Sequence, residues 1–179
     1  MNFQQLIITG VGGQGILFIT RLLAETAIAK GMPVLTSETH GMAQRGGIVI
    51  SHLKVGDFSS PLVRPGQADG LIALKAENVA FHRSFMRSGG WITANGDESS
   101  CVTGEPGAAT IDADAIALRL GNPTAVNLIV LGQAASSGRL FCSPEEVTMI
   151  IRRKLQQKPL LLEGALAAFA AGITDTSRS

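Results

Sequence analysis

A strand, a glycine-rich loop and a helix follow one another at the start of this chain, and this order strongly constrains the fold. The apolar run Leu6–Ile8 indicates a buried strand, and Gly10-Val-Gly-Gly-Gln-Gly15 follows it almost directly. The loop fits the G-x-G-x-x-G pattern, which is informative at a strand-to-helix junction. Glycine permits a tight turn and a close ligand, and the helix points its free amides and positive end there. We therefore expect an anion or cofactor to contact Gly10, Gly12, Gly13, Gln14 and Gly15.

The same loop has two further interpretations. It is also compatible with a tight strand-to-helix turn that binds nothing, because a single G-x-G-x-x-G pattern is a weak signal. A nicotinamide site would need an acidic residue at the end of the second strand to contact the ribose. Glu38 is a candidate for that role, although it lies within a denser polar cluster.

That polar cluster is the segment Ser37-Glu-Thr-His-Gly-Met-Ala-Gln-Arg-Gly-Gly47. Histidine can donate or accept a proton near neutral pH, and arginine can hold a carboxylate or phosphate by two hydrogen bonds. Ligands of open α/β sheets lie beyond the carboxyl ends of the strands. If the first two strands are parallel, Glu38, His40 and Arg45 share a crevice with the glycine loop, and we predict a functional role for them. The alternative is a loop in which Glu38 and Arg45 simply pair with each other.

Hydrophobic periodicity predicts an α/β fold with a Rossmann-like first βα unit. The expected strands are Gln5–Thr9, Pro33–Ser37, Gly47–Val55, Gly70–Leu74 and Trp91–Ala94, with a short strand in Cys101–Thr110. The expected helices are Gly15–Lys30, Lys75–Arg87, Ala113–Leu120, Thr124–Ser136, one starting at Ser143, and Leu161–Ala171. Val55–Phe58 indicates a turn into an edge hairpin, and Gly89-Gly90 a turn before the next strand.

Composition restricts the class of protein. The chain has 179 residues, a net charge of +1 and 4% aromatic residues, so we expect neither a nucleic-acid nor a membrane partner. Charged residues make up only 16%, below the usual ~25%, which suggests that some surface is covered by a partner. Cys101 and Cys142 form no C-x-x-C cluster, so we expect no metal or iron-sulfur site in this chain. We expect one cytoplasmic domain, residues 1–173, with a flexible tail at 174–179.

The glycine loop and the segment Ser37–Gly47 together resemble the gamma component of the 2-oxoacid:ferredoxin oxidoreductases. The similarity is greatest to the small (beta) subunit of the indolepyruvate type. It continues through Gln67–Leu74, Gly89-Gly90 with the strand after them, Asn127 and Leu131-Gly132, and covers essentially the whole chain.

The resemblance implies a subunit of an enzyme that decarboxylates a 2-oxoacid on thiamine diphosphate, sends electrons through [4Fe-4S] clusters to ferredoxin, and forms acyl-coenzyme A. This chain has neither a GDG…N thiamine diphosphate motif nor cluster cysteines, so the resemblance places both cofactors on a partner chain. It further implies that the chain folds into three layers, α/β/α, with a mostly parallel, mixed sheet, and that it is inactive alone. It places Glu38, His40 and Arg45 at the subunit interface, where they would shape substrate or coenzyme A binding.

Two residues depart from the family pattern. Thr39 stands where a valine is frequent, and Lys75 stands where an acid often follows the fourth strand, so the role of Lys75 is open. Two other functions are also compatible with this sequence. One is an independent nucleotide-binding module, such as a small NAD-dependent dehydrogenase, and the other is a purely structural assembly subunit.

Overall fold

The computed structural model describes residues 3–40, 47–97, 99–100, 102 and 107–175. Six strands in this part form one sheet, in the order β2-β3-β1-β4-β5-β6. The strands are β1 (Gln4–Val11), β2 (Val34–His40), β3 (Ile48–Val55), β4 (Ala68–Ala73), β5 (Met86–Asn95) and β6 (Ala108–Ile111). The helices are α1 (Ile16–Ala29), α2 (Asn78–His82), α3 (Ala113–Arg119), α4 (Val126–Ser136), α5 (Pro144–Leu155) and α6 (Pro159–Asp175).

The direction of the strands is mixed but mostly parallel, as the sequence predicts. Strands β1, β4, β5 and β6 run parallel to one another. Strand β3 is antiparallel to both β1 and β2, so β1 and β2 point the same way with β3 between them. The first βα unit is therefore Rossmann-like in its local order, but a third strand separates its two strands.

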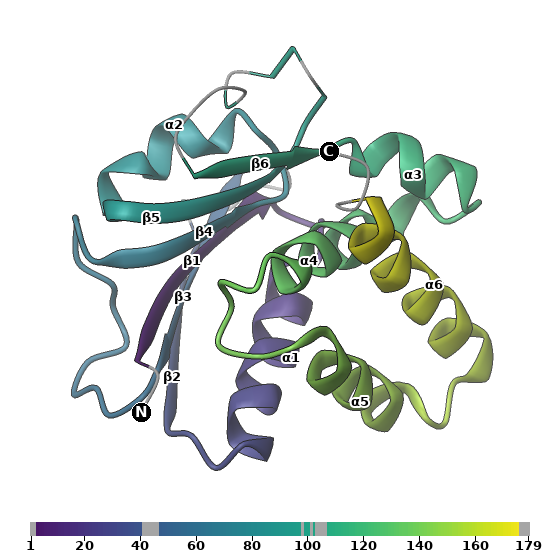
Figure 1. Ribbon diagram of the computed structural model, residues 1–179, viewed down its shortest axis with the longest axis horizontal. Coiled ribbons are helices and arrows are strands. Elements are labelled where there is room, and N and C mark those ends of the chain that lie inside the picture. Colours follow the sequence, from purple (N-terminus) through teal and green to yellow (C-terminus); the bar gives the residue numbers. More distant parts are fainter. Residues whose placement is uncertain (1–2, 41–46, 98, 101, 103–106, 176–179) are drawn as a thin grey trace.

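Helices cover both faces of the sheet and give the three layers (Figure 1). Helices α1, α3, α4, α5 and α6 pack on one face, around a core that includes Leu6, Leu23 and Ile129. The short α2 covers the other face, where Ile7, Leu71 and Val79 are buried together. Alternate residues of β1 thus enter different cores, as strand geometry requires. Both faces of the central strands are covered by helices, and the sequences of these strands are therefore continuous apolar runs.

Helix α4 lies at the centre of the larger core and is buried over almost its whole length. Glycines allow α6 to approach it closely. A side chain at Gly132 would meet the carbonyl oxygen of Phe169, and one at Gly172 would meet that of Ile129. The contact between α4 and α6 therefore depends on small residues from both helices.

Several expected boundaries are wrong. No strand lies in 56–67 and no edge hairpin forms after Val55, because β3 is already paired on both sides. The helix expected at 75–87 is only α2 and the 3₁₀ turn Arg83–Phe85, since Met86 and Arg87 belong to β5. Gly89 and Gly90 lie inside β5 rather than before it. Helix α6 extends to Asp175, beyond the predicted Ala171, and residues 176–179 lie outside the described part of the chain.

No helix in the described part of the chain has both the length and the apolar character needed to span a membrane.

Candidate functional site

The glycine loop joins β1 to α1 and is braced by its own glutamine. The amide oxygen Oε1 of Gln14 accepts a hydrogen bond from the backbone N–H of Val11 at 2.7 Å. The Nε2 group of Gln14 donates to the carbonyl oxygen of Leu74, at the end of β4, at 3.5 Å. Gln14 thus holds the loop against the neighbouring strand, and its side-chain amide is occupied by main-chain groups.

Helix α1 begins without a side-chain cap. Its N-cap residue, Gly15, has a left-handed backbone with φ of 80°, and the first turn contains no acidic residue. By contrast, Asp112 caps α3 and Ser143 caps α5. The backbone N–H groups of residues 13 and 15–17 have no acceptor among the described residues. Such a helix end suits an anion, because the free amides and the helix dipole act in the same direction.

Space is open at Gly13 and closed at Gly15. Gly13 has φ of 97°, and a Cβ atom placed there would meet nothing within 4 Å. A Cβ atom on Gly15 would collide with the amide nitrogen of Asn127, which reaches the loop from the first turn of α4. Gly13 therefore lies at the open side of the loop, and Gly15 at its packed side.

The end of β2 lies at the same edge of the sheet as the glycine loop. Val11 at the end of β1 pairs with Ile48 of β3, and His40 at the end of β2 pairs with the adjacent Val49. Two strand spacings of ~4.8 Å put these ends roughly 10 Å apart. The backbone N–H of Gly12 also donates to the carbonyl oxygen of Gly47, at 3.0 Å.

The structure describes only part of the polar loop that the sequence predicts. Glu38 is exposed on β2 and pairs through its backbone with Ser51 of β3. The backbone of His40 ends β2, but its side chain and all of Arg45 lie outside the described part of the structure. The strand order also weakens the nicotinamide interpretation. Because β3 separates β2 from β1, Glu38 is not on the strand next to the glycine loop, where a ribose contact would be made.

A cavity of about 480 Å³ opens at the carboxyl ends of β4, β5 and β6. Its polar lining includes Lys75, Glu77, Asn95, Asp97, Asp112 and Asp114. Sequence reasoning missed this cavity and left the role of Lys75 open. The signal that could have found it is the run of polar residues directly after the buried strands at Lys75 and Asn95, since ligands of α/β sheets lie at this edge.

Asn95 organises the wall between this cavity and the glycine loop. Its Nδ2 group donates to Asp114 Oδ2 at 2.8 Å and to the carbonyl oxygen of Leu74 at 3.3 Å. Its Oδ1 atom accepts from the backbone N–H of Ala113 at 3.0 Å, at the start of α3. The Leu74 carbonyl oxygen also accepts from Gln14, so a single backbone group connects the loop to the cavity.

Hydrogen bonds favour the ionised form of one carboxylate in this cavity. Hydrogen bonds from the side chain and backbone of Ser99 lower the pKa of Asp97, which lies on the surface. Within the described ranges, no group of three His, Cys, Asp or Glu side chains is arranged to hold a metal ion.

Burial, with the nearby Glu146, raises the pKa of the Cys142 thiol to about 12, so this cysteine stays protonated and unreactive at neutral pH.

The sequence matches a known protein family over nearly its whole length. The family model of pyruvate ferredoxin/flavodoxin oxidoreductase matches residues 5–174. The chain belongs to this family. It is 31% identical to indolepyruvate oxidoreductase subunit IorB of Archaeoglobus fulgidus, over 86% of each chain. It is 28% identical to the subunit of the same name from Pyrococcus horikoshii, over 97% of this chain and 96% of the relative.

Solved structures share the fold. The gamma subunit of a keto/oxoacid ferredoxin oxidoreductase from Geobacter sulfurreducens has a TM-score of 0.77 at 22% identity, covering 98% of this chain and 99% of that one. A chain of the 2-oxoglutarate:ferredoxin oxidoreductase from Magnetococcus marinus, solved with 2-oxoglutarate, coenzyme A and succinyl-CoA, has a TM-score of 0.79 at 21% identity. The match covers 96% of this chain but 30% of that one. This pyruvate ferredoxin/flavodoxin oxidoreductase chain is thus a gamma-type subunit of a multi-subunit 2-oxoacid:ferredoxin oxidoreductase.

Proposed function

We propose that this chain is the small subunit of an indolepyruvate-type 2-oxoacid:ferredoxin oxidoreductase, which converts an aryl pyruvate to the acyl-coenzyme A. The observation that carries the proposal is its similarity to IorB subunits over nearly their full length. Thiamine diphosphate and the [4Fe-4S] clusters belong to the partner subunit in this proposal, and ferredoxin is reached through the complex. The chain's own task is to complete the binding site at the interface.

The glycine loop supplies an anion site in this proposal. The uncapped start of α1 offers backbone amides, and Gly13 leaves room for a phosphate or carboxylate to approach. Coenzyme A is one candidate, because it carries phosphates and is present in the related Magnetococcus marinus enzyme. Gln14 acts indirectly, by holding the loop to Leu74.

The polar loop supplies charge and proton chemistry in the same proposal. His40 ends β2 at the edge of the sheet that carries the glycine loop, and Glu38 precedes it on the same strand. We assign Glu38, His40 and Arg45 to the interface near the reacting groups. There, the guanidinium of Arg45 would hold an anionic group. The imidazole of His40 would orient that group or donate a hydrogen bond to it.

Co-expression tests the proposal directly. The chain is produced alone and together with a candidate partner that carries a GDG…N motif and C-x-x-C motifs. Reduction of a viologen dye is then measured with indolepyruvate, phenylpyruvate, pyruvate and 2-oxoglutarate, each with coenzyme A. We expect activity only from the complex, with the highest kcat/KM for an aryl pyruvate. Dye reduction by the chain alone, or tight NAD binding to it, would contradict the proposal.

Variants of the polar loop test its assignment within that complex. We expect His40→Ala and Arg45→Ala to lower kcat/KM by roughly ten- to a hundred-fold, the value of a lost charge-assisted contact. Thr36→Ala, at an exposed position of the same strand β2, is the control and should leave turnover unchanged. If His40→Ala and Arg45→Ala instead lower the Tm with normal kcat/KM, the loop is part of the scaffold.

A further inference from the structure

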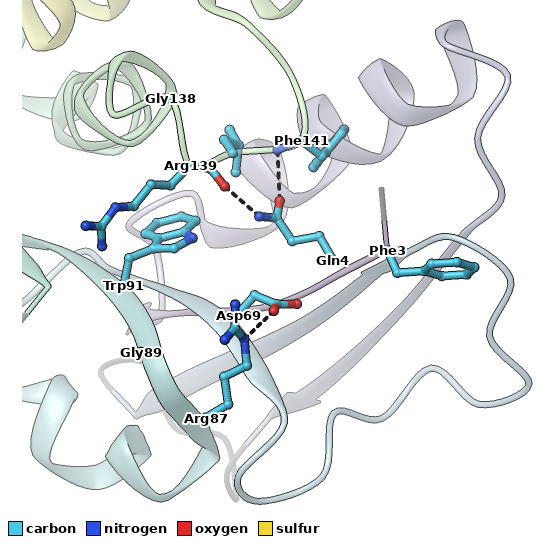
Figure 2. Close-up of a pocket in the computed structure, with 10 residues that line it drawn as sticks. Phe3, Gln4, Asp69, Arg87, Gly89, Trp91, Gly138, Arg139 and Phe141 are labelled. Carbon is cyan, nitrogen blue, oxygen red and sulfur yellow. Dashed lines mark hydrogen bonds and ion pairs between the residues drawn. The ribbon is translucent and has the colours of Figure 1, made fainter. Parts of the chain in front are cut away.

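A second cavity lies at the opposite edge of the sheet from the glycine loop. It has a volume of about 690 Å³ and is formed at the amino ends of β1, β4 and β5 together with the loop between α4 and α5. Figure 2 shows Arg87 and Arg139 on two sides of it, with Trp91, Gln4 and Asp69 between them. Nothing in the proposed function uses this cavity.

An irregularity in β5 gives the cavity its shape. Ala68 of β4 pairs with Met86 of β5, and Gly70 pairs with Trp91, so one residue of β4 faces four residues of β5. Gly89, with φ of 73°, makes this bulge possible. Bulges redirect side chains and are frequent beside binding sites. Here the bulge places Arg87 at the rim of the cavity, and the indole of Trp91 lies across Gly70, where a Cβ atom would collide with it.

Arg87 is fixed by a carboxylate. Its Nε group contacts Asp69 Oδ1 at 2.6 Å, and Asp69 Oδ2 accepts from the backbone N–H of Gln5 at 2.7 Å. Because Asp69 is itself held by β1, the guanidinium of Arg87 is positioned before any ligand binds. Pre-organised cations lose less conformational entropy on binding than free ones.

Arg139 is positioned through its backbone and keeps its side chain available. The carbonyl oxygen of Arg139 accepts from Gln4 Nε2 at 2.7 Å, and Gln4 Oε1 accepts from the N–H of Phe141 at 2.9 Å. The side chain of Arg139 is exposed and has no hydrogen-bond or ion-pair partner among the described residues. A second polar group is without a partner in the same part of the structure, since the buried indole Nε1 of Trp91 has none among the described residues.

A smaller cavity of about 450 Å³ continues the first one. It shares Arg87, Gly89 and Arg139 with it and adds Arg83 to the lining. Three arginines therefore face two adjoining cavities, and Asp69 is the single carboxylate among the described residues that line them. A concave surface with excess positive charge concentrates anions.

We propose that these adjoining cavities bind a small molecule that carries a diphosphate group. One phosphate lies between Arg87 and Arg139, which line both cavities, and the second lies toward Arg83. Arginine binds phosphate through parallel N–H donors, and both cavity volumes lie within the ~300–1,000 Å³ typical of small-molecule sites. These volumes favour a small molecule over an acidic segment of a protein.

Calorimetric titration of the full chain, and of the complex with its partner, tests the proposal. The probes are inorganic pyrophosphate, ADP and hexaglutamate at one low ionic strength. We expect pyrophosphate to bind, and Arg139→Gln to weaken that binding at least ~10-fold, as for a lost charge-assisted hydrogen bond. Arg152→Gln, on the exposed part of α5, removes the same charge elsewhere and should leave binding unchanged.

Each outcome decides one question. Tighter binding of ADP than of pyrophosphate identifies a nucleotide, and equal binding identifies the free diphosphate as sufficient. Absence of pyrophosphate binding, or equal weakening by Arg139→Gln and Arg152→Gln, overturns the proposal. Tighter binding of hexaglutamate that depends on Arg139 also overturns it, in favour of an acidic protein segment. Because Arg139 is exposed, the Tm of the unliganded variant should match that of the parent chain, which confirms that the variant is folded.

Discussion

Gly13 and Gly31 stand at the two ends of α1 and make similar demands on the backbone. Their φ values are 97° and 69°, and a Cβ atom on either would meet nothing within 4 Å. The two positions differ in what surrounds them. Gly13 lies on the loop that we assign to an anion, whereas Gly31 simply ends the helix. They therefore form a matched pair for separating backbone strain from ligand contact.

We expect Gly13→Ala and Gly31→Ala each to lower the free energy of unfolding by about 1–2 kcal/mol, the cost of a left-handed conformation for a residue with a Cβ atom. Only Gly13→Ala should also lower kcat/KM of the assembled enzyme, because its methyl group occupies the space left for a ligand. Urea unfolding and steady-state kinetics on both variants check this. Equal kinetics for the two variants would reduce the glycine loop to a turn.

His52 and His82 predict a pH dependence of stability. Burial is the main cause that lowers the pKa of both imidazoles below the usual 6.5, and His52 Nδ1 accepts a hydrogen bond from the N–H of Val63 at 3.2 Å. The folded state thus binds fewer protons than the unfolded state near and below pH 6.5. We expect the free energy of unfolding to be at its full value above about pH 7 and to fall as the pH decreases through 6.5 toward 5.

Urea unfolding between pH 8 and pH 5 measures this effect. Glutamine can accept the same hydrogen bond without titrating, so the double variant His52→Gln/His82→Gln should show a flatter profile. An unchanged slope in that variant would assign the loss of stability to other groups.

The sequence alone predicts the glycine loop but not the bonding of its members. Gln14 seemed a ligand contact from its place in the motif, yet its amide joins Val11 and Leu74. Leu74 lies far along the chain, and the strand order that brings it next to the loop cannot be read from local pattern. Local pattern also does not assemble the cavity around Lys75 and Asn95, because its walls come from several separate segments and only the polar residues at two strand ends point to it.

At the scale of elements, local chemistry predicts a boundary well where a cap defines it. Ser143-Pro144-Glu145-Glu146 predicts the start of α5, and the structure contains the full capping box with Val147, Ile150, Ile151 and Leu155 buried. Gly89 and Gly90 show the opposite case. Two successive glycines are typical of a turn, but the pairing of β5 with β4 keeps both within a bulged strand. Local pattern therefore predicts caps, and tertiary pairing decides strand ends.

The capping box gives a prediction about stability. The Ser143 Oγ atom accepts from the backbone N–H of Glu146. Glu146 Oε2 accepts from the N–H of Ser143 and from Nζ of Lys30, the residue that follows α1. We expect Ser143→Ala to lower the free energy of unfolding by about 1 kcal/mol, the usual value of an N-cap. Ser59→Ala, in an exposed loop, is the control. Equal midpoints of chemical unfolding for the two variants would show that the cap adds nothing to stability.

At the scale of the whole molecule, the sequence predicts the α/β class and its layers but not the order of the strands. Alternation of apolar strands and amphipathic helices is enough to predict a sheet covered on both faces. The position of β3 between β1 and β2 follows from pairing across distant parts of the chain. That one strand moves Glu38 away from the glycine loop, and so bears directly on the choice between a nicotinamide site and a subunit interface.

The insertion of β3 also determines when the sheet can form as the chain is made. On the ribosome, β1 and α1 emerge first, but both hydrogen-bonded neighbours of β1, β3 and β4, are synthesised later. Until Val55 has left the exit tunnel β1 is an unpaired apolar strand, and until Ala73 has left it one edge of β1 stays open, a form that is prone to aggregate. Non-local pairing of this kind slows folding, because distant segments must meet before any contact stabilises them. The newborn subunit therefore exposes, while it is being made, a strand that is buried on both faces in the folded protein.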